Sequence, residues 1–247
     1  MNWDIIVMGF SLWNCFTVPV AVCFDPPQLN YRFFVIFNYI VDFFFFIDIL
    51  ISFRCVVYDD KGEEIVIDKE MALDYLQSTF IIDILATVPF DLLFPKLNVE
   101  ILGILKLGRI LRLSKIIRYL RTTNDIKASL RIFKMVLFLV IYLHSYTCMW
   151  WWLALSTKTW MPPMDTAFGV DFSIYKKGFL RKYLVSLLYA VQVCLGSDNF
   201  PTNTVETAVA AIGLFVGGLI NANIFGELAM IFSELDRNTK AFQSKIA

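Results

Sequence analysis

Residues 99–121 read VEILGILKLGRILRLSKIIRYLR, a stretch in which Leu, Ile and Gly separate regularly spaced basic side chains. The basic residues fall at every third position: Lys106, Arg109, Arg112, Lys115, Arg118 and Arg121. Because an α-helix repeats every 3.6 residues, a step of three winds slowly around its axis. In a 3₁₀ helix the same residues would form one stripe. The stretch therefore predicts an apolar helix that carries a spiral of positive charge.

This basic helix has two interpretations. It could be an amphipathic helix of a soluble protein or of a membrane surface. However, apolar runs long enough to span a bilayer flank it on both sides. Charges among spanning segments are costly, and moving one charge through the membrane field is worth about 2.3 kcal/mol per 100 mV. We therefore predict that residues 99–121 are a voltage sensor or the relic of one.

The composition indicates an integral membrane protein. Of the 247 residues, 58% are hydrophobic and 18% are charged, which is too apolar for a soluble domain. The formal net charge is zero, so the overall balance says nothing about nucleic acid. The expected partners are the lipid bilayer and further subunits, with no nucleic acid. The sequence shows no phosphate loop, nucleophile triad or metal cluster, so we do not expect an enzyme. The cysteines lie in or beside apolar runs and are expected to be buried thiols: Cys15, Cys23, Cys55, Cys148 and Cys194.

The apolar runs predict an all-α membrane fold of six transmembrane helices. The expected spans are residues 4–24, 31–57, 72–94, 99–121, 126–155 and 205–235. Residues 180–193 form an amphipathic helix too short to cross the bilayer, so we expect a re-entrant pore helix. The expected domains are a voltage-sensor-like domain at 1–121 and a pore domain at 122–235.

The basic residues between the fourth and fifth spans place that connection in the cytoplasm by the positive-inside tendency. The outer loop expected at residues 156–178 is also basic. It is longer than the connection between the fourth and fifth spans, and the positive-inside tendency weakens in long loops. An even number of spans then places both termini in the cytoplasm, and the plasma membrane is the expected location. We expect no cleavable signal peptide, so the first apolar run is a retained span.

Acids on neighbouring spans are expected to face the basic helix, because charges in hydrocarbon need partners. The candidates are Asp42 and Asp48 on the second span and Asp83 on the third. Phe45 lies three residues before Asp48, on about the same helix face, where its ring would exclude water while passing a cation. Alternatively, the acids only neutralise static basic residues during folding.

Several further segments occur in one characteristic order. They are Asp48 with Phe53 and Arg54, residues 83–91 (DILATVPFD), His144 and Cys148 followed by residues 150–152 (WWW), and residues 217–228 (GGLINANIFGEL). The chain thereby resembles six-span cation channels of the cyclic-nucleotide-binding-domain superfamily: cyclic-nucleotide-gated, hyperpolarisation-activated and ether-à-go-go-type channels.

The resemblance implies an assembly and a cytoplasmic linker. Four copies, identical or mixed, would surround one pore in the lipid bilayer, with each sensor beside the pore of its own subunit. Residues 236–247 would begin a linker to a nucleotide-binding domain that does not lie within the 247 residues. A cyclic-nucleotide response is expected only through such a domain. We expect no cofactor in this chain.

The selectivity filter is expected at Cys194, Leu195, Gly196, Ser197 and Asp198. Potassium filters expose backbone carbonyls from a Thr-Val-Gly-Tyr-Gly run. Here the first glycine is kept, whereas the aromatic residue and the second glycine are absent. We therefore expect a filter that passes Na⁺ and K⁺ with little discrimination. The alternatives are a potassium-selective channel with a divergent filter and a non-conducting regulatory subunit.

Asp198 is a candidate cation site at the outer mouth. Four copies would form an acidic ring that attracts Na⁺ and K⁺ and binds Ca²⁺. Alternatively, Asp198 caps a turn or pairs with Arg181 or Lys182.

The sixth span carries the expected gate. Asn221 and Phe225 are one helical turn apart, and the resemblance implies that they form the inner constriction, although Asn221 departs from the hydrophobic pattern. Gly217 and Gly218 are a candidate hinge, and close helix packing explains them equally well. His144 is expected to be a hydrogen-bonded packing residue rather than a proton relay.

Overall fold

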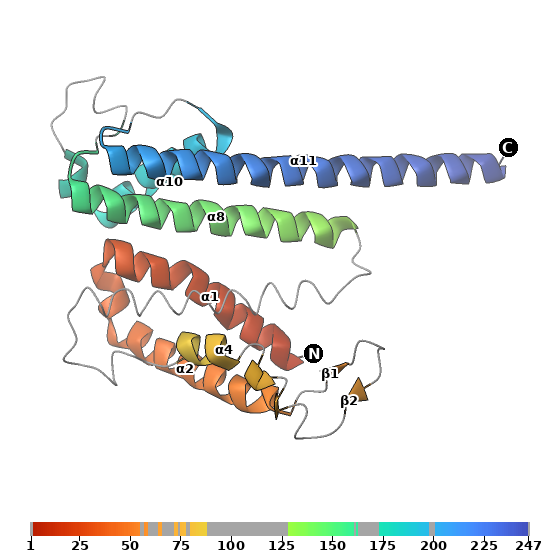
Figure 1. The fold of residues 1–247 in the computed structure, drawn as a ribbon, viewed down its shortest axis with the longest axis horizontal. Coiled ribbons are helices and arrows are strands. Elements are labelled where there is room, and N and C mark those ends of the chain that lie inside the picture. Colours follow the sequence, from red (N-terminus) through yellow and green to blue (C-terminus); the bar gives the residue numbers. More distant parts are fainter. Residues whose placement is uncertain are drawn as a thin grey trace. The chain divides into compact units, whose positions relative to one another are not determined.

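The computed structural model divides into two compact units, Met1–Thr122 and Thr123–Ala247. Figure 1 shows the helices of each unit. The described residues are 2–54, 57–58, 64–65, 72–73, 75–77, 80–87, 128–160, 162, 173–197 and 201–246.

The first unit is built on two long apolar helices, α1 (Asn2–Phe24) and α2 (Arg32–Ser52). The 3₁₀ turn η1 (Pro27–Asn30) joins them. α1 ends at Phe24, as the Asp25-Pro26-Pro27 sequence predicts, because proline cannot donate a helical hydrogen bond. Val7, Val41 and Phe45 form the buried contact between the two helices.

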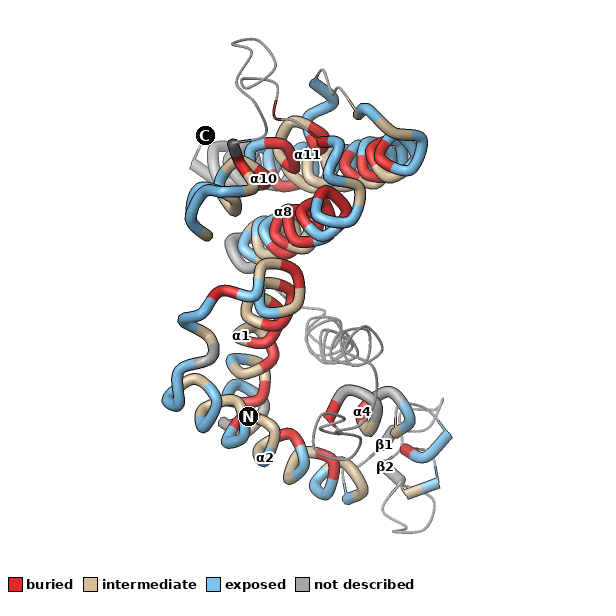
Figure 2. The backbone as a smooth tube through the Cα atoms, turned by 90° about the vertical axis from the view of Figure 1, so that its left-hand side faces the viewer, coloured by how far each residue is buried: buried red, intermediate tan, exposed pale blue. Residues whose placement is uncertain are grey.

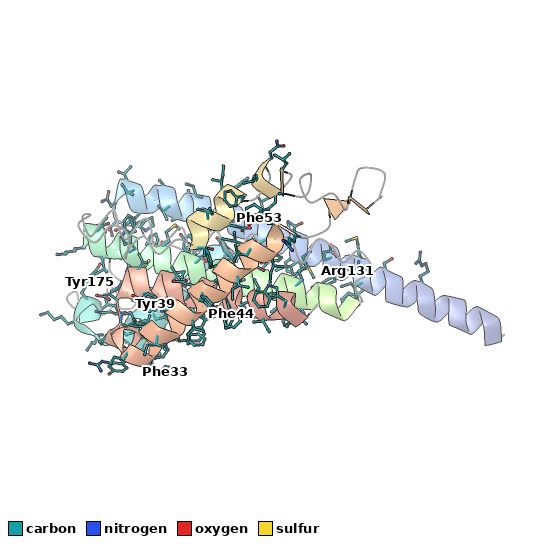
Figure 3. All side chains as sticks on the ribbon, turned by 90° about the horizontal axis from the view of Figure 1, so that it is seen from below. Phe33, Tyr39, Phe44, Phe53, Arg131 and Tyr175 are labelled. Carbon is teal, nitrogen blue, oxygen red and sulfur yellow. The ribbon has the colours of Figure 1, made fainter. Side chains whose placement is uncertain are left out.

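Beyond α2 the first unit contains a small hairpin and a short helix. The strands β1 (Val57–Tyr58) and β2 (Glu64–Ile65) pair in antiparallel fashion. The helix α4 (Phe80–Thr87) lies within the expected third span. Phe53, labelled in Figure 3, contacts the ring of Phe80 in α4 edge-on, and it contacts the ring of Tyr75 before α4 in the same way.

The second unit packs a short helix against two long ones. Its elements are α8 (Ala128–Thr157), η3 (Ser173–Lys176), α10 (Phe179–Leu195) and α11 (Thr204–Ile246). α10 contacts both α8 and α11. The buried residues gather where these helices meet (Figure 2). The last turns of α11 extend beyond the other two helices (Figure 1).

Four helices of the described residues are long and apolar enough to cross a membrane: Ile5–Phe24, Arg32–Ser52, Arg131–Thr157 and Thr204–Ser233. They coincide with the expected first, second, fifth and sixth spans. The expected fourth span lies outside the described residues. α11 continues to Ile246, beyond the expected end at 235, because residues 236–246 contain neither proline nor glycine to stop a helix.

Candidate functional site

The candidate site is the C-terminal end of α10. Gly196 follows the helix with φ of 74° and ψ of 23°, a left-handed conformation that glycine adopts without steric cost. The Gly196 N–H donates to the carbonyl of Val193 at 3.2 Å, and the Ser197 N–H donates to the carbonyl of Gln192 at 3.0 Å. The retained glycine of the expected filter therefore ends the short helix.

α11 contacts this end of α10 directly. The side-chain amide of Asn221 donates to the Cys194 carbonyl oxygen at 2.7 Å. One turn earlier, a Cβ added to Gly217 would lie 2.9 Å from the Cys194 Cα. Cys194 itself is buried. The start of the expected filter thus rests on two residues of α11.

A second close approach joins α11 to α8. The Tyr142 hydroxyl donates to the Gly213 carbonyl at 2.7 Å. A Cβ at Gly213 would lie 2.4 Å from the Tyr146 ring. Glycine is therefore required here by packing, as small residues commonly are between membrane helices.

Glu206 occupies the start of α11 and is fully buried. One carboxylate oxygen accepts hydrogen bonds from the hydroxyls of Thr157 and Thr159, each at 2.8 Å. The other accepts from the Thr202 N–H at 3.0 Å and from its hydroxyl at 2.9 Å. A buried carboxylate is costly unless it is hydrogen-bonded, and these four bonds satisfy it. Glu206 thereby ties α8 to the segment that precedes α11.

Aromatic rings fill the space between α8 and α10. Trp150 stacks on Tyr189 with ring centroids 4.1 Å apart, and Trp160 contacts both rings edge-on. His144 is hydrogen-bonded to the Tyr183 hydroxyl at 2.8 Å, which confirms the expected packing role. Tyr175 donates to the Trp160 carbonyl at 2.9 Å, and burial together with the nearby Glu206 carboxylate raises the pKa of Tyr175 to about 12.

Two of the expected sensor counter-charges have neutral hydrogen-bond donors in the first unit. Trp3 Nε1 donates to Asp48 at 2.9 Å, and the Tyr75 hydroxyl donates to Asp83 at 3.0 Å. Asp83 is only 1% exposed. Phe45 is buried in the contact between α1 and α2. Asp42 is half-buried on α2.

A model of the family described as "Ion transport protein" matches residues 1–241. The chain belongs to the ion transport protein family. It is an integral membrane protein. Its described residues form two helical units, each with long apolar helices.

Several voltage-gated potassium channels are similar to this family member. The human "Voltage-gated delayed rectifier potassium channel KCNH5" is 25% identical over 272 residues, 99% of this chain and 27% of the relative. The dog "Voltage-gated inwardly rectifying potassium channel KCNH2" is 26% identical over 99% of this chain and 23% of its own length. The mouse "Voltage-gated inwardly rectifying potassium channel KCNH7" is 29% identical over 99% of this chain and 23% of its own length. The chain spans about a quarter of the length of these relatives.

The predicted site residues fall into two groups. The basic ladder (Lys106, Arg109, Arg112, Lys115, Arg118 and Arg121) and Asp198 lie outside the described residues. Cys194, Gly196, Gly217 and Asn221 come together at the end of α10, whereas Leu195 and Phe225 are each 71% exposed. α11 is unbroken at Gly217 and Gly218, and an added Cβ at Gly218 meets no atom within 4 Å.

The structure also places Lys182 and four of the cysteines, whereas the pairing proposed for Asp198 lies outside the described residues. Lys182, one suggested partner of Asp198, places its ammonium 5.6 Å from the ring centroid of Trp151. Four of the cysteines are buried outside any disulfide, as expected: Cys15, Cys23, Cys148 and Cys194. Cys55 lies outside the described residues.

Sequence reasoning missed Glu206. Two signals could have found it. An acid inside an apolar span is by default a candidate functional residue. In addition, Asn203 and Glu206 have the spacing of a helix capping box, in which a polar residue is followed by Glu three positions later.

Proposed function

We propose that this protein is a voltage-gated cation channel of the plasma membrane, formed by four identical or homologous copies with their termini in the cytoplasm. The observation that carries the proposal is α10, a helix too short to cross a bilayer that ends at a left-handed Gly196 between two long helices. A helix of this kind presents backbone carbonyls to an ion path. Membership of the ion transport family supports the same conclusion.

We propose that the voltage dependence of this channel arises from the basic segment at residues 99–121. Each charge that crosses the full field contributes about 2.3 kcal/mol per 100 mV, so a ladder of charges produces steep gating. Replacing Arg112 with Gln should reduce the slope of the conductance–voltage relation. An unchanged slope in this variant, and in the corresponding variants of the other five basic residues, would contradict the sensor assignment.

For selectivity, we infer that Na⁺ and K⁺ pass with little discrimination. The run from Leu195 to Asn199 lacks the aromatic residue and the second glycine of potassium filters. Ca²⁺ binding at a ring of Asp198 side chains belongs to the same proposal. Replacing external Na⁺ with K⁺ should move the reversal potential by only a few millivolts, because the two permeabilities are proposed to be nearly equal.

A potassium-selective channel is the second candidate, and the similar proteins named as potassium channels favour it. In that case the reversal potential follows the potassium gradient in the same recordings. Silence of the protein expressed alone, with gating charge still moving, would instead favour a regulatory subunit. Cyclic-nucleotide control is proposed only through a domain outside the 247 residues, and adding cyclic AMP to excised patches of the full-length protein tests it.

A further inference from the structure

The carbonyl of Cys194 needs a hydrogen-bond donor from outside its own helix. The last carbonyl groups of an α-helix have no partner within it. At the end of α10, the Gly196 and Ser197 amides go to the carbonyls of Val193 and Gln192. The Cys194 carbonyl instead receives the Asn221 amide at 2.7 Å.

The backbone of α11 is held close to the same residue. Gly217 and Asn221 are four positions apart, so they lie on one face of α11. A Cβ at Gly217 would lie 2.9 Å from the Cys194 Cα and 3.2 Å from its carbonyl oxygen. The neighbouring Gly218 faces elsewhere, because a Cβ there meets no atom within 4 Å.

We propose that Asn221 is a positioning residue for the selectivity filter. Its amide holds the Cys194 carbonyl at the point where α10 ends and the expected filter begins, and the bare backbone at Gly217 allows α11 to come close enough for this bond. The inference rests on the proposed channel function. It gives Asn221 a role different from the inner constriction that the family resemblance implies, and it leaves Phe225 as the candidate gate residue.

This arrangement couples α11 to the filter. A rotation of α11 about its axis carries the Asn221 amide away from the Cys194 carbonyl, so the bond breaks before the helix has turned far. The first filter carbonyl then loses its donor and its fixed position. Ion selectivity and the stability of the conducting filter should therefore depend on Asn221.

The first test measures relative permeability to Na⁺ and K⁺ from reversal potentials of the full chain. Asn221→Ala is paired with Asn223→Ala, because the Asn223 amide bonds only to the Leu219 carbonyl of its own helix among the described contacts, at 3.0 Å. Losing one net hydrogen bond shifts the equilibrium of the filter by about fivefold. We expect a changed permeability ratio or faster loss of conduction in Asn221→Ala and wild-type behaviour in Asn223→Ala. Equal behaviour of the two variants would overturn the proposal.

A second pair keeps the test valid if Asn221→Ala fails to fold. Gly217→Ala and Gly218→Ala both gain helix propensity, but only the former places a methyl group 2.9 Å from the Cys194 Cα, so the backbone there must shift. We expect the altered permeability ratio in Gly217→Ala alone. The same ratio in Gly217→Ala as in Gly218→Ala and wild type would contradict the proposed contact.

Chemical modification of Cys194 gives a readout that needs no current. The Cys194 side chain is 4% exposed, so a small methanethiosulfonate reagent should label it slowly in the purified full chain. Peptide mass spectrometry should show about fivefold faster labelling of Cys194 in Asn221→Ala, with no change at the buried Cys148. If wild type carries no current but this difference is found, the channel proposal fails, and with it the filter role of Asn221, whereas its contact with the Cys194 carbonyl stands. If currents are normal and labelling is unchanged, the positioning role fails.

Discussion

Replacing Glu206 with alanine should destabilise the second unit more than replacing Glu227, another carboxylate of α11. The change deletes the acceptor of four hydrogen bonds, from Thr157, Thr159 and the N–H and hydroxyl of Thr202. Thr157 retains a bond to the Leu153 carbonyl at 3.2 Å, whereas the Thr202 N–H is left with no acceptor from Glu206.

The magnitude follows from these contacts. Hydrogen bonds to a charged group contribute about 1.5–3 kcal/mol each, but desolvating the carboxylate costs several kcal/mol in return. A net loss of about 2–4 kcal/mol is therefore expected for Glu206→Ala. Glu206→Gln should cost less, about 1–2 kcal/mol, because its carbonyl oxygen still accepts from Thr202 while the threonine hydroxyls rotate to accept from its NH₂ group.

Thermal unfolding followed by tryptophan fluorescence measures this difference, because Trp150 and Trp160 are buried in the same unit. For a unit of this size the loss in Glu206→Ala corresponds to a Tm lowered by about 5–15 °C. Glu227→Ala is the control, since Glu227 Oε2 is buried without a hydrogen-bond partner within the described structure. A Tm for Glu206→Ala equal to that of Glu227→Ala would refute the reasoning.

Three further predictions concern packing, pH and the first unit. Gly213→Ala forces a methyl group into the Tyr146 ring and should lower the free energy of unfolding by about 1–3 kcal/mol, measured by the same thermal assay. The neutral phenol of Tyr175 stabilises the fold below pH about 10, and this contribution is lost as the pH rises through its raised pKa of about 12; Tyr175→Phe should remove that alkaline component from stability–pH curves. Trp3→Phe removes the donor to Asp48 and should lower the free energy of unfolding by about 1 kcal/mol, measured by denaturant titration.

The helices were predictable from the sequence because their signals are local. Pro26 and Pro27 end α1 at the expected residue, and the apolar run of the sixth span predicts α11. The short α10 was expected at 180–193 and occupies Phe179–Leu195, where Gly196 ends it. In each case a few neighbouring residues decide the backbone conformation.

The contacts of the candidate site were not predictable, because each joins residues far apart in the sequence. Hydrophobic periodicity says which face of a helix is buried but not which atom meets it. The family resemblance implies a place for Asn221 at the inner constriction, but it does not reveal that the Asn221 amide donates to the Cys194 carbonyl, 27 positions earlier. Glu206 meets Thr157 across 49 positions, and no local pattern specifies that pairing.

Four residues of α11 whose contacts are described above form one stripe along its first half. Glu206, Gly213, Gly217 and Asn221 are separated by seven, four and four positions, so at 100° per residue they lie within an arc of about 80°. The stripe is about 22 Å long, because each residue rises 1.5 Å. A bend at Gly217 would separate Glu206 from Asn221 and break the contact with Cys194. Movement of α11 that keeps the contact proposed to position the filter must therefore occur beyond Asn221, where Phe225 is 71% exposed.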